Sequence, residues 1–134
     1  MLTVGYTTVH GAEWVYFNKT LSGDYYYDKE SITSGGKGIV KVWEKQIYSE
    51  KGKQDYIRQL KEKGIYDTKL EDLSYSVDLH TIKCSTREFN VIYWVHRNSE
   101  EEIIDSCSGP SPSYNQISPE SIIESLYKIL CKGR

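Results

Sequence analysis

Hydrophobic and polar positions alternate along most of the chain with the period of two that is typical of half-buried strands. Residues 12–19 and 24–28 are rich in aromatic and β-branched side chains, and Ser31 and Ile32 begin a short third segment. Longer segments of the same kind cover residues 39–43, 73–84, 88–97 and 102–108. The pattern predicts a sheet built from about six strands.

Glycine and polar clusters separate these segments. Residues 34–38 read Ser-Gly-Gly-Lys-Gly, and a strand pattern follows them directly. A phosphate-binding loop of the Walker type would be followed by a helix, so a hairpin turn is the better interpretation. Residues 98–101 are expected to form a second hairpin turn.

Two segments have helical spacing instead. Residues 53–63 carry Tyr56, Ile57 and Leu60 on one narrow stripe, and Gly64 follows as a helix-ending residue. This helix should lie on the surface. A second helix has a wide apolar stripe, with Ser118 as its expected cap, Pro119 in its first turn and a capping-box pattern at residues 121–124. Gly133 is expected to end it.

The second helix needs an apolar sheet face to cover. Residues 73–80 alternate between apolar and polar positions, and the alternation changes phase near His80 and Thr81, which predicts a β-bulge there. We expect the helix to pack on the face that carries Tyr75, Val77, Phe89, Val91 and Tyr93.

These elements predict an α+β fold, with an antiparallel sheet of about six strands, a C-terminal helix packed on one face and a short additional surface helix. The 134 residues allow one domain. We assign residues 1–11 to a loose N-terminal segment and residues 12–134 to a single α+β domain.

Composition narrows the classes of function. The net charge of −2 disfavours nucleic-acid binding, and no apolar run is long enough for a membrane span. The chain contains 12 Tyr and 3 Trp, which bury large rings while keeping a polar atom wet. We therefore predict a binding surface on the sheet face away from the C-terminal helix, with these candidate residues: Trp14, Tyr16, Tyr26, Trp43 and Trp94.

Catalytic and metal-binding patterns are weak. His10, His80 and His96 are the three histidines, and Cys84 could in principle pair with His80 or His96 in a thiol enzyme or a metal site. No recognised motif flanks any of these residues. Asp24 and Asp28 lie four residues apart in a strand, about 13 Å, which is too far to share a proton. We predict no enzyme activity, no cofactor and no metal.

The three cysteines form no CxxC pair or zinc-like spacing. The first residues lack the basic and apolar regions of a signal peptide. Two alternatives therefore stay open: a cytosolic protein with reduced thiols, or the mature part of an exported protein in which two cysteines pair.

The order of several short motifs resembles the surface-adhesin protein E family of small exported bacterial domains. A YYD-x-x-SI block occupies residues 26–32, VKVWEK occupies residues 40–45, and an I-x-P-x-S helix start at residues 117–121 leads to Cys131. The resemblance covers residues 12–131. Two features depart from it: Tyr114 stands where a Trp is frequent, and the charged helix at 53–63 resembles an insertion.

The resemblance implies an antiparallel sheet with a C-terminal helix, in a protein that binds host extracellular-matrix proteins. It also implies a Cys84–Cys131 disulfide with Cys107 left over, and export to the periplasm or the cell surface. Helical geometry places Cys131 beside the apolar stripe, so the bridge requires either that the helix ends near Leu130 or that the Cys84 strand reaches around it.

The functional expectation is a non-enzymatic, exported binding or envelope-associated domain that presents an aromatic-rich sheet face to a protein or a small ligand. Its partner would be an extracellular or envelope protein, and it would be a monomer or a weak homodimer. Two alternatives remain. One is a self-assembling module that pairs through edge strands; the other is a small hydrolase that uses a thiol or a histidine.

Overall fold

The computed structural model describes residues 12–108 and 113–132. The expected loose segment at residues 1–11, with His10, lies outside the described residues. So do most of the expected loop at 109–113 and the expected helix-ending Gly133.

A single antiparallel sheet forms the body of the protein. Its strands follow the order β1-β2-β4-β5-β6-β7, while β3 pairs with β4 and β8 pairs with β6. The predicted antiparallel sheet is therefore confirmed. The strand bounds are β1 Trp14–Thr20, β2 Gly23–Asp28, β3 Thr33–Ser34, β4 Ile39–Tyr48, β5 Leu73–Lys83, β6 Glu88–Asn98, β7 Ile103–Ser108 and β8 Asn115–Gln116.

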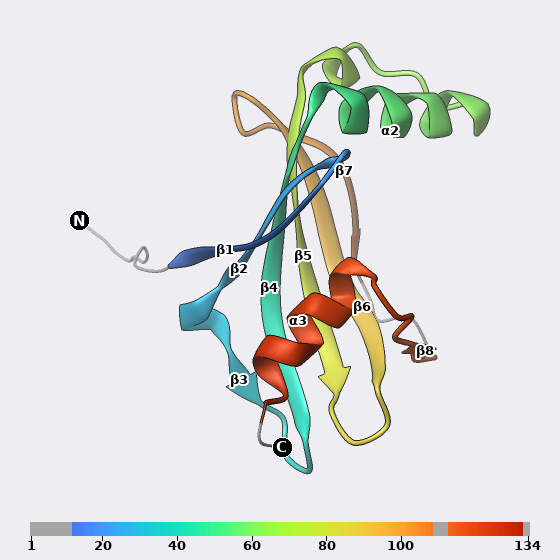
Figure 1. Ribbon diagram of the computed structural model, residues 1–134. Coiled ribbons are helices and arrows are strands. Elements are labelled where there is room, and N and C mark those ends of the chain that lie inside the picture. The colour runs from blue at the N-terminus through green and yellow to red at the C-terminus, as the bar shows by residue number, and fades with distance from the viewer. Residues whose placement is uncertain (1–11, 109–112, 133–134) are drawn as a thin grey trace.

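Two α-helices accompany the sheet, together with the short 3-10 helices η1 (Lys29–Ser31) and η2 (Thr68–Asp72). Helix α3 (Ile122–Leu130) lies across one face, whereas α2 (Glu50–Glu62) lies at one end of the strands (Figure 1). The α+β fold class is confirmed. Among the helices that the structure describes, none has the length and apolar character needed to cross a bilayer.

The apolar stripe of α3 packs on the sheet and forms the main core. Leu126 is fully buried and Leu130 is 7% exposed. Beneath them lie residues of β4, of β5 and of the segment before the helix, and the buried core consists of Val40, Val42, Ile82, Cys84, Ile117, Leu126, Leu130 and Cys131. Burial of this stripe explains why a nine-residue helix is stable in this position.

Helix α3 begins later than the sequence predicted. Ser121, and not Ser118, is the N-cap, because its hydroxyl accepts a hydrogen bond from the Glu124 amide at 3.2 Å. Pro119 therefore precedes the helix. The capping-box pattern was the correct signal, although the Glu124 carboxylate accepts from the Glu120 amide at 2.8 Å and not from that of the cap.

The face that α3 covers differs from the predicted one. Opposite residues of paired strands share a face, and the register between β5 and β6 shifts after Leu79, so that Ile92 of β6 is the extra residue. Phe89 therefore joins the core under α3, whereas Tyr93 emerges on the opposite face. The prediction that α3 covers Tyr75, Val77 and Tyr93 is wrong, because all three lie on the helix-free face.

A disulfide joins the end of the sheet to the end of α3. Cys84 follows β5 directly, Cys131 is the C-cap of α3, and their Cα atoms lie 5.5 Å apart. The helix ends at Leu130, which is the first of the two arrangements expected for the bridge. Tyr127 donates a hydrogen bond from its hydroxyl to the Cys84 carbonyl at 3.1 Å. Cys107 is a free and exposed cysteine.

Removing the bridge should destabilise the domain without changing its fold. The bridge spans 47 residues, and loop-closure entropy for that length corresponds to about 4 kcal/mol as an upper value. We expect the double variant Cys84→Ser/Cys131→Ser to lose about 2–4 kcal/mol in urea unfolding. Cys107→Ser is the matched control and should unfold like the wild type, and equal stability of all three proteins would contradict the prediction.

Helix α2 extends three residues further toward the N-terminus than predicted. Ser49 caps it, and its hydroxyl accepts a hydrogen bond from the Gly52 amide at 3.0 Å. Ile57 and Leu60 are its buried apolar residues. Gly52 is buried against the turn between β1 and β2, where an added Cβ atom would overlap the backbone carbonyl of Ser22.

Replacing Gly52 by alanine should therefore destabilise the protein. In an open helix position the same change stabilises by roughly 0.5–1 kcal/mol, but here backbone atoms must move apart. We expect Gly52→Ala to lower stability by about 1–3 kcal/mol. Gln54→Ala, on the exposed side of the same helix, should change stability little. A Gly52→Ala variant that melts at or above the wild-type temperature would show that α2 can move away from Ser22.

Candidate functional site

The sheet face without helices carries a group of aromatic side chains, which we call the open aromatic face. Its rings contact one another in edge-on pairs, with Tyr16 and Tyr26 at 5.7 Å and Trp43 and Tyr93 at 5.8 Å between centroids. The residues of this face are contributed by β1, β2, β4, β5 and β6, and they are Trp14, Tyr16, Tyr26, Trp43, Tyr75 and Tyr93.

Basic side chains lie among these rings. The Lys45 ammonium group lies 5.5 Å from the Trp14 ring and 4.6 Å from the Tyr75 ring. A shallow hollow of about 250 Å³ adjoins them, with a wall formed in part by Arg97 and Val95. The open aromatic face thus combines large apolar rings with positive charge, which suits contact with a partner that carries both apolar and acidic groups.

Four of the five residues predicted for the binding surface lie on this face. Trp94 does not. It lies opposite Asp78 in the sheet, and its ring meets the His96 ring edge-on at 5.0 Å, on the side where the helices pack. The β-bulge at the extra residue Ile92 explains this difference, because it reverses the direction of every side chain that follows in β6.

Trp94 instead lines a cavity of about 580 Å³ between α2 and the sheet, which we call the α2 cavity. Tyr56 of α2 stacks on His96 of β6 at 4.4 Å, and the Tyr48 ring lies 6.1 Å from each of these two rings. The Tyr56 hydroxyl donates to the Asp105 carboxylate at 3.1 Å and lies 3.4 Å from His96 Nδ1. Burial lowers the pKa of His96 to about 4, against a smaller opposite effect of Asp105.

Three ionisable side chains meet below this cavity, on β4 and β5, and we call them the buried trio: Glu44, Asp78 and His80. Each offers an oxygen or nitrogen atom, and these atoms lie within 4.8 Å of one another. His80 Nε2 lies 2.9 Å from the Glu44 carboxylate, and both residues are less than a tenth exposed. The alternation in β5 places Asp78 and His80 at its polar positions, and Tyr56 of α2 lines the same cavity as Asp78.

The environment perturbs both Asp78 and His80. Burial raises the pKa of Asp78 to about 6, an effect opposed by the charge of His80 and strengthened by that of Glu44. Burial alone would lower the pKa of His80, but the charge and hydrogen bond of Glu44 outweigh it and raise that pKa. The two strands therefore hold a histidine and two carboxylates in one poorly solvated place.

The residues considered for thiol chemistry are not arranged for it. Cys84 is bonded to Cys131, so it offers no thiol to His80 or His96. Cys107 lines the α2 cavity together with His96, yet the described residues show no hydrogen bond between them. Cys107 pairs with Trp94 across the sheet.

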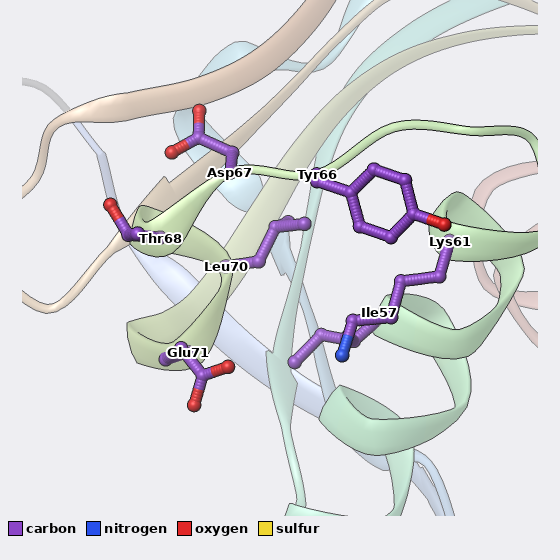
Figure 2. Close-up of a pocket in the computed structure, with 7 residues that line it drawn as sticks. All are labelled: Ile57, Lys61, Tyr66, Asp67, Thr68, Leu70 and Glu71. Atoms are coloured by element: carbon purple, nitrogen blue, oxygen red, sulfur yellow. The ribbon is translucent and has the colours of Figure 1, made fainter.

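A separate hollow of about 380 Å³ lies between α2 and η2. Figure 2 shows Ile57 from α2 and Leu70 from η2 lining it from opposite sides, with Tyr66 at its rim. Its floor is apolar, since Ile57 and Leu70 are both buried. None of the described residues that line the hollow is a histidine or a cysteine.

The depressed pKa of His96 should make stability depend on pH. The folded state keeps this ring neutral down to about pH 4, whereas the unfolded chain binds the proton near pH 6.5. Stability from this residue is therefore complete above pH 6.5 and falls as pH decreases toward 4, by about 2 kcal/mol between pH 7 and 5. The charged groups that line the same cavity as His96 are Asp78, Asp105 and Lys63.

The difference in unfolding free energy between the wild type and His96→Gln isolates this effect. Burial raises the pKa of Asp78 to about 6, and Glu44 raises that of His80, but both proteins contain these residues and their contributions cancel. The advantage of the wild type should shrink by about 2 kcal/mol from pH 7 to 5. A difference that stays constant over that range would mean that His96 is not held neutral.

A comparison with protein-family models matched residues 14–132 to the model described as Surface-adhesin protein E. Comparisons with curated proteins and with solved structures found no match. The matched region spans the whole sheet, both α-helices and both cysteines of the disulfide. This chain belongs to the surface-adhesin protein E family.

Proposed function

We propose that this domain is a non-enzymatic, exported adhesin-type module that binds an extracellular protein through its open aromatic face. Family membership supports an adhesin-like role at the surface or outside the cell. Export to the periplasm or the cell surface also agrees with a disulfide, because such bonds persist in oxidising compartments.

The observation that carries the proposal is the distribution of aromatic side chains between the two faces. Helix α3 packs on one face, α2 reaches the end of the same face through Tyr56, and six Tyr and Trp residues from five strands gather on the other face. Large rigid rings bury much area at little entropic cost, and Tyr, Trp and Arg dominate binding energy at protein interfaces. Tyr16 is 53% exposed, so it is available to a partner.

Charge supports a protein partner with acidic groups at the contact. Lys45 and Arg97 lie among the rings of this face. Basic groups at the edge of an aromatic patch speed association and fix orientation more than they add affinity. We therefore expect binding to weaken moderately with salt while the aromatic contacts persist.

Single aromatic truncations test the proposal. Wild-type protein, Tyr16→Ala and Trp43→Ala are compared for binding to a panel of immobilised extracellular-matrix proteins by biolayer interferometry. Loss of an anchoring ring should weaken binding by about 5–30-fold, which corresponds to about 1–2 kcal/mol. Circular dichroism checks that each variant is folded.

Tyr66→Ala is the matched control, because Tyr66 is 74% exposed and belongs to the hollow beside α2. It should bind like the wild type. If Tyr66→Ala loses as much binding as Tyr16→Ala and Trp43→Ala, or if both of these variants bind like the wild type, the contact lies elsewhere. Absence of binding by the wild type to every protein of the panel would contradict the adhesin-type function itself.

A further inference from the structure

We propose that the buried trio, Glu44, Asp78 and His80, is a binding site for one divalent transition-metal ion, with Zn²⁺ as the preferred ion. The proposal concerns the helix-covered face and is independent of the contact surface proposed above. It rests on the donor set, the positions of the donors, the unpaired buried atoms among them and the cavity that reaches them.

Sheet geometry places the three donors together. Glu44 of β4 lies directly opposite Asp78 of β5, and His80 follows two residues later in β5, so the three side chains share a face. Zinc binds histidine nitrogen and carboxylate oxygen at about 2.0–2.2 Å, which separates the ligand atoms of a tetrahedral site by about 3.4 Å. The donor atoms here lie within 4.8 Å of one another, so small side-chain rotations suffice to enclose an ion.

The trio is incomplete as a hydrogen-bonded network. Within the described part of the chain, Asp78 Oδ1 and His80 Nδ1 are buried atoms without a hydrogen-bond partner. His80 as a whole is only 5% exposed. Buried polar atoms are nearly always paired, and an unpaired one costs about 1–3 kcal/mol. An ion bound by both carboxylates and by His80 Nε2, the ring nitrogen that faces Glu44, would engage the unpaired Asp78 Oδ1 and compensate the buried negative charge, whereas Nδ1 would not be a ligand.

The chemistry of the donors selects the type of ion. Ca²⁺ and Mg²⁺ prefer six or more oxygen ligands, whereas an imidazole with two carboxylates suits zinc and related transition metals. Three protein ligands leave a fourth coordination position for water. Asp78 lines the α2 cavity, so this cavity gives the ion a path to the trio.

Metal titration of the wild-type protein is the first test. The full chain is treated with a chelator, dialysed and titrated with ZnCl₂ by isothermal titration calorimetry, with MgCl₂ as a parallel probe. We expect one Zn²⁺ per chain, a higher melting temperature with Zn²⁺ and no effect of Mg²⁺. With Co²⁺, a visible absorption band of a low-symmetry site should appear at the same stoichiometry. Failure of the wild type to bind Zn²⁺ overturns the proposal.

Variants of the buried trio and of the other histidines then locate the site. His80→Gln and Asp78→Asn should weaken Zn²⁺ binding by more than the 10–100-fold that loss of an outer partner costs, and should abolish the Co²⁺ band. His96→Gln and His10→Gln remove the other two histidines of the chain. Both variants should retain Zn²⁺ binding and the Co²⁺ absorption band. If either control loses as much Zn²⁺ affinity as the trio variants, or if folded His80→Gln still binds Zn²⁺ like the wild type, the ion binds elsewhere and the proposal is wrong.

Discussion

The fold depends on how α3 is fixed to one face of the sheet. The Cys84–Cys131 bond joins the end of β5 to the end of this helix, and Leu126 and Leu130 bury its stripe on Val40, Val42 and Ile82. On the flank of the helix, the Arg87 guanidinium lies 2.8 Å from the Glu124 carboxylate and 4.7 Å from the Tyr127 ring. Because the helix can occupy only one face, the other face keeps its aromatic side chains available.

The two faces consequently have different chemistry. The helix-covered face has an apolar half under α3 and a polar, aromatic half under α2, where the buried trio and the His96 stack lie. The open aromatic face has half-buried rings, the exposed Tyr16 ring and basic groups, but no buried ion pair among its described residues. The proposed contact surface on one side and the ionisable cluster on the other can therefore serve separate purposes.

Local sequence signals predicted much of this structure. Alternating aromatic and β-branched residues located the strands, the apolar stripe and capping-box pattern located α3, and family resemblance implied the disulfide. The strand and helix signals depend on residues that are close together in the sequence. The family resemblance depends on the order of several short motifs. The binding surface on the helix-free face was also anticipated for Trp14, Tyr16, Tyr26 and Trp43, although its use in binding stays a prediction.

Long-range features were not predictable in the same way. The extra residue Ile92 reverses the faces of all later β6 residues, and only the pairing with β5 reveals it. Asp78 and His80 alternate as the polar side of β5, and the residues beside them come from other elements: Tyr56 of α2 lines the same cavity as Asp78, and the Phe89 ring lies 6.3 Å from that of His80. An alternation of hydrophobic and polar residues shows that a strand has two different faces. It does not show which of them another element will cover.

The most direct test of the account is hydroxyl-radical footprinting of the protein, free and bound to an extracellular-matrix protein. The account predicts that binding protects the side chains of Tyr16 and Trp43 from oxidation and leaves Tyr66 unchanged. Protection confined to Tyr66 and α2, with Tyr16 and Trp43 still oxidised as in the free protein, would contradict it.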